Sequence, residues 1–322
     1  MISRHVKWLG LALLIPTLAL AQAYPQKNVT IVVSAAPGGP TDTLVRPLAA
    51  QLRERFNQTF IVENRAGAGG NIATDQVARA PADGYTLLAT NDASIVVNPQ
   101  IYDKLPYDAL KDLQPIAMLG DNGDIVLAVT QDSPAKNVQE LVEQLRRDPK
   151  ANYVSSGVGF PSHIVSELFK REAKFDAVHI PSKGSSNGLL QLLSGDINFY
   201  FMPASMAAAQ IKGGKIRLLA VAANKRNYLL PDVPTMAESG YPGVSPAPYW
   251  ITIFAPSGTP KAVIDSLSKE IRHITDTPSY QQVLRLQGLL PSTLNPEDLS
   301  QRMSNDFNYW KGTVKALGIH VD

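Results

Sequence analysis

The sequence contains no cysteine, so no disulfide can stabilise a chain of 322 residues and its stability must come from a hydrophobic core. Histidine is also scarce. The five histidines show no HxH or HExxH spacing, and there is no thiol to complete a metal site. We therefore predict no metal and no cofactor.

An excess of charge of one sign is missing as well. The chain has 30 Lys and Arg against 28 Asp and Glu, and Arg4 and Lys7 lie in an N-terminal leader. Without that leader the charges balance. Nucleic acids and anionic membranes attract proteins that carry a basic field. The charge balance therefore argues against both as partners.

The leader, residues 1–23, has the pattern of a secretory signal peptide. It joins a short basic start to an apolar run over residues 8–20, and its A-x-A sites end at Ala21 and Ala23. The apolar run is short for a membrane span, and no later run is long and apolar enough to cross a bilayer. We predict an exported protein that is cleaved near Ala21 or Ala23, with an uncleaved anchor as the alternative.

Residues 29–46, VTIVVSAAPGGPTDTLVR, predict a strand, a tight loop and a helix. Such a loop exposes backbone N–H groups at the positive end of the helix, and can hold an anion without a cationic side chain. Gly38 and Gly39 would let a ligand approach the backbone. Thr41 can cap the helix, and Asp42 lies in its first turn. An ordinary turn is the alternative, while nucleotide binding is not expected because the loop lacks P-loop and GxGxxG spacing.

Strand and helix patterns alternate along the rest of the chain, which predicts mostly parallel sheets flanked by helices. A second glycine-rich loop, residues 64–70, lies at the same sheet edge as the first, so both should face one cleft. A polar turn at residues 120–124 and a proline-rich return after residue 230 indicate two crossings between two lobes. We assign residues 24–123 plus 240–322 to lobe 1 and residues 124–239 to lobe 2.

The second lobe repeats the pattern of the first. A strand over residues 153–156 precedes a glycine-rich loop and a helix capped by Ser162, which would bring a second helix N-terminus to the cleft. A plain cap is the alternative for Ser162. His163 either contacts the ligand or packs at the helix start, and His179 is expected to be structural.

Residues 184–188, GSSNG, fit the G-x-S-x-G pattern of a hydrolase nucleophile elbow, with Ser186 as the nucleophile. Pro181 and Lys183 lengthen the turn beyond a sharp elbow, and no acid is placed to orient the later histidines. We therefore predict no catalytic residue and keep a secreted serine hydrolase that uses Ser186 as an alternative.

Several stretches, taken in order, resemble one family: PGGPTD at residues 37–42, VENRAGAGG at 62–70 and ADGYTLL at 82–88. From about residue 24 to the C-terminus the chain is similar to the Bug-type solute receptors, the extracytoplasmic substrate-binding proteins of tripartite tricarboxylate transporters. The resemblance implies an α/β, two-lobed, type II-like periplasmic-binding-protein fold. It also implies a monomeric, non-enzymatic periplasmic receptor that delivers a small carboxylate to membrane components of such a transporter. A ligand sensor for a membrane signalling partner is a further alternative.

In this family the first loop is taken to grip a ligand carboxylate through backbone groups and water. Together with the reading of the loops, this gives the candidate ligand-binding residues Pro37, Gly38, Gly39, Pro40, Thr41, Asp42, Ala68, Gly69, Gly159, Phe160, Ser162, His163, Ser182, Lys183 and Gly184.

The chain departs from the family pattern at three places. Phe160 stands where the family often has Ser, Ser182 where it often has Tyr, and Met202-Pro203 where it often has Asp-Asn. Without that acid a ligand ammonium has no obvious partner. The sequence thus favours an aromatic or aliphatic carboxylate over an amino acid.

Overall fold

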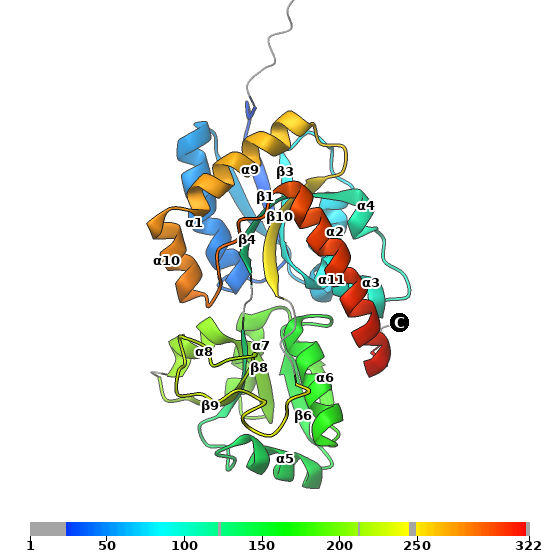
Figure 1. Cartoon of the computed structure of the whole chain (residues 1–322), viewed down its shortest axis with the longest axis vertical. Coiled ribbons are helices and arrows are strands. Elements are labelled where there is room, and N and C mark those ends of the chain that lie inside the picture. Colours follow the sequence, from blue (N-terminus) through cyan, green and yellow to red (C-terminus); the bar gives the residue numbers. More distant parts are fainter. Residues whose placement is uncertain (1–23, 122–123, 212, 245–248, 320–322) are drawn as a thin grey trace, which may run out of the picture.

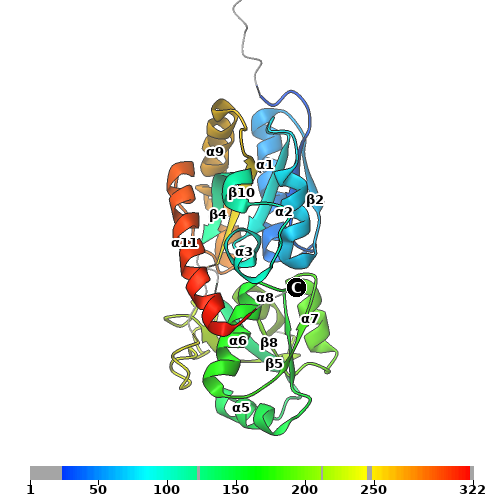
Figure 2. The same ribbon diagram turned by 90° about the vertical axis from the view of Figure 1, so that its right-hand side faces the viewer.

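The computed structural model describes residues 24–121, 124–211, 213–244 and 249–319, so the predicted signal peptide lies outside the described residues. The described residues form two α/β lobes, which lie one above the other in Figures 1 and 2. None of the helices described is long and apolar enough to cross a membrane.

Lobe 1 is built on a five-stranded sheet with the order β2-β1-β3-β10-β4. Strand β1 runs parallel to β2 and β3, whereas β10 is antiparallel to both β3 and β4. Four strands therefore point the same way and only β10 is reversed. The strands are β1 (Val29–Val33), β2 (Phe60–Asn64), β3 (Thr86–Asn91), β4 (Leu113–Asp121) and β10 (Trp250–Pro256).

Lobe 2 has a sheet of the same design, with the order β7-β6-β8-β5-β9 and β5 as its reversed strand. In each lobe the reversed strand is the first one after a crossing between the lobes. The prediction of two mostly parallel sheets is confirmed. The strands are β5 (Ile125–Thr130), β6 (Asn152–Ser155), β7 (Val178–Pro181), β8 (Phe199–Pro203) and β9 (Ile216–Ala222).

Helices cover both faces of the lobe 1 sheet, which explains why its strands read as continuous apolar runs. Ile31 and Val33 pack with α1, α9 and α10, while Val32 packs on the opposite face with α2 and α11. The helical segments of this lobe are α1 (Pro40–Phe56), η1 (Ala68–Gly70), α2 (Asn71–Ala78), η2 (Ala93–Val97), α3 (Asn98–Ile101), α4 (Ala109–Asp112), α9 (Lys261–Thr275), α10 (Pro278–Leu286) and α11 (Pro296–Leu317).

The helices of lobe 2 pack around its sheet in the same way, and α5 and α6 bury their apolar side chains in one core with Phe199 and Phe201. They are α5 (Val138–Arg147), α6 (Pro161–Ala173), α7 (Ser185–Leu193) and α8 (Ala204–Ile211).

The C-terminal helix α11 belongs to lobe 1 but reaches lobe 2. In Figures 1 and 2 it runs along lobe 1 and ends beside α6. There the Arg171 guanidinium donates to the carbonyl of Ala316 at 2.6 Å, and Ile164 of α6 packs in the same apolar cluster as Trp310 and Val314. The lobes are therefore in direct contact on the α6 side of the molecule.

Helix starts were the least accurate part of the sequence reading. Thr41 does not cap α1, because that helix begins at Pro40 with Gly39 in the cap position. Ser162 does not cap α6 either, because Pro161 fixes a helical φ one residue earlier and Phe160 is the cap residue. Helix α8 was not predicted at all.

The predicted lobe boundaries remain predictions. The first falls between β4 and β5. At the second, the side chains of Tyr241 and Val244 still pack in the lobe 2 core. This packing favours a crossing a few residues later than residue 240.

Two buried tryptophans give a matched test of one hydrogen bond in lobe 1. Trp250 Nε1 donates to Asp306 Oδ2 at 2.9 Å, whereas Trp310 Nε1 is buried and has no partner among the described residues. A hydrogen bond to a charged group contributes about 1.5–3 kcal/mol. Urea denaturation should therefore show that Trp250→Phe lowers the free energy of unfolding by about 1–2 kcal/mol more than Trp310→Phe does. Equal losses would mean that the bond adds nothing.

Candidate functional site

Three helices begin at one small cavity between the lobes. The first helical residues Pro40 of α1, Pro161 of α6 and Ser185 of α7 all line it, as does Ser162. The first N–H groups of a helix have no intrahelical partner and carry a partial positive charge. Because three such ends lie around one cavity, we take this cavity as the candidate anion site.

Side-chain capping supports this interpretation. Helices α5, α10 and α11 are capped by the side chains of Asn137, Thr277 and Asn295, whereas α1, α6 and α7 have no side-chain cap. Helix α9 also lacks one. A missing cap alone therefore does not mark a site, but three uncapped helix ends that converge leave N–H groups available to a ligand.

The cavity, which we call the inner cavity, has a volume of about 20 Å³. A cavity needs about 10–15 Å³ to hold one water molecule. It is lined by Pro40, Asp124, Ile125, Ser156, Phe160, Pro161, Ser162, Ser185, Pro203, Tyr249 and Gln287. None of these lining residues is Lys or Arg, so the attraction for an anion must come from dipoles.

Asp42 shapes the first loop from within. The N–H of Gly38 donates to its Oδ2 at 2.9 Å, and the side chains of Arg46 and Asn64 donate to the same carboxylate. Burial alone would raise the pKa of Asp42, but the hydrogen bonds from Arg46, Gly38 and Asn64 outweigh burial and hold this pKa below its usual value. The carboxylate therefore fixes the loop and is not aimed at an incoming anion.

Lobe 2 contributes a cluster of neutral hydroxyls. Ser156 Oγ hydrogen-bonds with Ser185 Oγ at 2.9 Å and with the Tyr200 hydroxyl at 2.7 Å, and Ser162 Oγ accepts from the N–H of Ser156 at 2.9 Å. Burial raises the pKa of Tyr200 to about 12, so this hydroxyl stays neutral near pH 7. Such hydroxyls can turn a proton toward a carboxylate without bringing a formal charge.

Phe160 closes the inner cavity from the α6 side. Its side chain is 8% exposed, and a Cβ at Gly157 would lie 3.2 Å from the ring. Phe160 stands where the resembling family often has Ser, and its aromatic ring forms part of the cavity wall.

Three of the predicted glycines hold the lobes close together. A Cβ at Gly159 would collide with Asn98 Oδ1, and a Cβ at Gly69 would collide with the carbonyl oxygen of Val158 in the other lobe. Gly184 likewise packs on Ala36. These positions need glycine because another chain segment approaches the backbone, and the arrangement is that of closed lobes.

The two histidines of lobe 2 stack on each other, with ring centroids 4.1 Å apart. The N–H of Gly159 donates to His163 Nδ1, and His179 Nε2 pairs with Ser155 Oγ. Burial lowers the pKa of His163 to about 4 and, together with the neighbouring His163, that of His179 to about 3. Both rings are therefore neutral near pH 7, and His163 supports the loop that carries Phe160.

The remaining predicted residues lie near the cleft but do not line the inner cavity. The Ser182 hydroxyl bonds to the carbonyl of Ser155, at the end of β6, and to that of Gly184 in its own loop. Lys183 is exposed, and so is Ala68 in η1. Ligand contact by the predicted residues stays a prediction.

Ser186 has no catalytic base among the described residues. It is the second residue of α7, and its hydroxyl donates across the cleft to the carbonyl of Pro37 at 3.4 Å. The histidine that does pair with a serine, His179, pairs with Ser155 and lies under the stacked ring of Tyr153. The G-x-S-x-G pattern therefore marks a helix start.

The sequence offered Tyr249 only as one of several aromatics that line a cleft or pack in the core, and it did not single out Ser156, Ser185, Gln287 or Asp124; all five line the inner cavity. Asp124 matters most, because the expectation of no acid for a ligand ammonium overlooked it. Its Oδ2 accepts from Asn227 at 2.7 Å, and burial raises its pKa. The only signal was its place directly after the first crossing.

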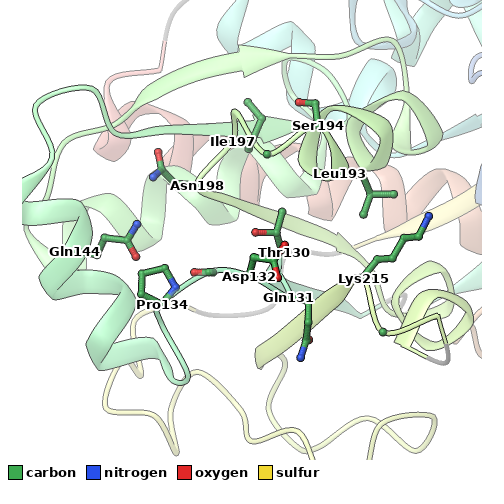
Figure 3. A pocket seen from close by; sticks show the side chains of 13 residues that line it. Thr130, Gln131, Asp132, Pro134, Gln144, Leu193, Ser194, Ile197, Asn198 and Lys215 are labelled. Carbon is green, nitrogen blue, oxygen red and sulfur yellow. The ribbon is translucent and has the colours of Figure 1, made fainter.

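A larger cavity lies elsewhere. It measures about 670 Å³ and is lined by residues of β5, α5, α7 and the loops beside them at the far end of lobe 2, among them Thr130, Gln144 and Lys215 (Figure 3). It contains no predicted site residue and no converging helix ends among the residues described. We therefore place the site at the cleft.

Comparison with known proteins identifies the family. Residues 44–319 match the family described as "Tripartite tricarboxylate transporter family receptor". The chain belongs to this receptor family. Among its relatives, the receptor is 32% identical to a UPF0065 protein of Bordetella pertussis over 94% of this chain and 93% of that one. It is also 32% identical to Protein BugT of the same species over 92% and 91%.

Solved structures of similar proteins share the fold of the receptor. R. palustris Rpa4515 with adipate superposes with a TM-score of 0.87 at 32% identity and covers 92% of this chain and 99% of that chain. Periplasmic binding protein BugD gives 0.86 at 32%, with 92% and 99% covered. MatC of Rhodopseudomonas palustris with bound malate gives 0.85 at 29%, with 90% and 100% covered. The resemblance found in the sequence is confirmed.

The histidine stack predicts a loss of stability in acid. Because the pKa of each folded-state ring lies below the ordinary value of about 6.5, the unfolded state binds more protons as the pH falls below 6.5. The free energy of unfolding should therefore fall between pH 6.5 and pH 4, by on the order of 2 kcal/mol for each ring.

Urea titrations at several pH values test this expectation. His179→Phe keeps a stacked ring but cannot titrate, so it should flatten the pH dependence. His273→Gln, at an exposed position outside the stack, provides the matched control variant. An unchanged slope in His179→Phe would show that His179 does not contribute to the acid loss.

Proposed function

We propose that this receptor captures a small organic carboxylate in the cleft between its lobes and delivers it to the membrane components of a tripartite tricarboxylate-type transporter. It acts in the periplasm as a monomer, after cleavage of the signal peptide near Ala21 or Ala23. The observation that carries the proposal is the convergence of the α1, α6 and α7 N-termini on a cavity without Lys or Arg in its lining.

The relatives support the class of ligand. One similar structure holds adipate and another holds malate, and both are small carboxylates. In the receptor, Phe160 adds an aromatic wall to the inner cavity, which favours an aromatic or aliphatic acid. Amino acids remain candidate ligands as well, because the Asp124 carboxylate offers a partner to an ammonium group.

Calorimetric titration of the purified mature receptor with citrate, aspartate, adipate, benzoate and terephthalate separates these classes. We expect binding of at least one acid, with aspartate weaker than the best acid that lacks an ammonium group. If aspartate were the tightest ligand, the preference for aromatic or aliphatic acids would be wrong, although the receptor function would stand. Native mass spectrometry of the freshly purified protein would identify an acid that co-purifies.

The proposal excludes catalysis, so Ser186 should not react as an activated nucleophile. Its hydroxyl lies against Pro37 without a histidine partner among the described residues. A fluorophosphonate probe should leave the receptor unlabelled. If the wild type is labelled and Ser186→Ala is not, Ser186 is an activated nucleophile and the protein is a hydrolase.

A single hydroxyl provides a test of the site itself. Ser185 lines the inner cavity at the first residue of α7, whereas Ser194, at the other end of α7, is exposed. A hydrogen bond to a charged group contributes about 1.5–3 kcal/mol, so Ser185→Ala should weaken binding of the best acid by about tenfold or more. Ser194→Ala should bind like the wild type, and the same titration measures both. If Ser185→Ala bound the acid as tightly as the wild type does, the Ser185 hydroxyl would not contact the ligand.

A further inference from the structure

A second cavity adjoins the inner one on the side of the molecule formed by α7 and α8. It measures about 410 Å³, within the range of roughly 300–1,000 Å³ that small-molecule sites occupy. Pro40 and Gln287 line both cavities, so the two are neighbours. In Figure 1, α1 and α10 of lobe 1 lie above α7 and α8 on this side. We call this second cavity the outer groove.

The outer groove combines apolar and neutral polar side chains and has no charged residue in its lining. It is lined by Gly38, Pro40, Thr43, Ser186, Leu189, Leu190, Ser205, Met206, Ala209, Gln210 and Gln287. None of these lining residues is charged. Leu190 is 66% exposed beside it, which is unusual for a large apolar side chain. The lining suits an aliphatic or aryl group and offers no cation to a second carboxylate.

The inner cavity has no room for more than a small polar group. At about 20 Å³ it accommodates roughly one water-sized group in the closed arrangement. On the α6 side the cleft is sealed by Phe160 and by the contact of Gly159 with Asn98. A ligand whose carboxylate meets the helix N-termini must therefore extend toward the outer groove.

We propose that the outer groove holds the uncharged tail of the ligand, so that the receptor selects monocarboxylates with an extended apolar tail. This inference rests on the proposed function, since the carboxylate is the group held at the inner cavity. The groove is assembled from both lobes, and two hydrogen bonds cross it: Ser205 Oγ donates to Gln287 Oε1 at 3.2 Å, and Ser186 Oγ donates to the carbonyl of Pro37. A tail in the groove contacts both lobes and thereby favours the closed state.

A series of straight-chain acids tests the proposal on the purified mature receptor by calorimetry. Acetate, butyrate, hexanoate and octanoate should bind with a Kd that falls by about fourfold for each added methylene until the groove is filled. Hexanoate should also bind more tightly than adipate, because adipate brings a second charge into an uncharged groove. If these acids bind with no gain from chain length, or if adipate binds more tightly than hexanoate, the tail assignment is overturned while the receptor function stands. Failure of every carboxylate to bind would overturn the proposed function itself.

A variant that fills the groove provides a second test of the proposal. Ala209 is an exposed residue of α8 in the groove lining, and Ala209→Trp should reduce the ratio of octanoate to butyrate affinity to near one. Ala262, exposed in the first turn of α9 and outside the groove lining, serves as the matched control, and Ala262→Trp should keep the wild-type ratio.

If Ala209→Trp does not fold, Leu190→Gln is the replacement, because this exposed position tolerates a polar side chain and should also lower the ratio. Circular dichroism establishes folding for each variant. A wild-type ratio in a folded Ala209→Trp or Leu190→Gln variant would place the tail elsewhere.

Discussion

The proposed site depends on the starts of α1, α6 and α7, which have no side-chain caps. These helices begin in different lobes, yet their first residues line one cavity. A β-strand followed by a short loop and a helix places each helix start at the carboxyl edge of its sheet. Two sheets of the same topology, facing each other across a cleft, therefore bring the positive ends of their helices together. The cleft is attractive to anions because of this topology, before any side chain is considered.

The absence of a cation from the lining of the inner cavity fits a protein that must release its ligand. A buried ion pair is difficult to break, because removing one partner leaves an uncompensated charge. Here the ion pair of Asp42 with Arg46 stays within the first loop and its helix, and shapes them. The ligand would meet backbone amides and the hydroxyls of Ser156 and Ser185 instead. Such groups contribute affinity without leaving a charge stranded when the lobes open.

Local features of the sequence predicted local structure well, and the site only in part. The apolar residues of α5 and α9 recur with a helical period, so the sequence predicts helices over Val138–Arg147 and Lys261–Thr275, which are the bounds observed. The start of α7 was missed, since Ser185 and Ser186 resemble a turn as much as a first helical turn. Asp124, Tyr249 and Gln287 meet only because β5, β10 and α10 are brought together by the two crossings. Periodicity identifies elements but not which of them pair, so no pattern in the chain could have joined these three residues.

The two sides of the cleft are closed by different contacts. This asymmetry determines toward which side a bound ligand can extend. On the α6 side, glycine backbones pack directly against the opposite lobe, and Ile164 is buried with Trp310 of α11. On the α7 and α8 side, the lobes meet through the hydrogen bonds of the Ser205, Ser186 and Tyr228 hydroxyls. Parting buried apolar surfaces costs free energy in proportion to the area exposed, whereas a hydroxyl that loses its protein partner can bond to water instead. A ligand that outgrows the inner cavity therefore meets less resistance toward α7 and α8 than toward α6.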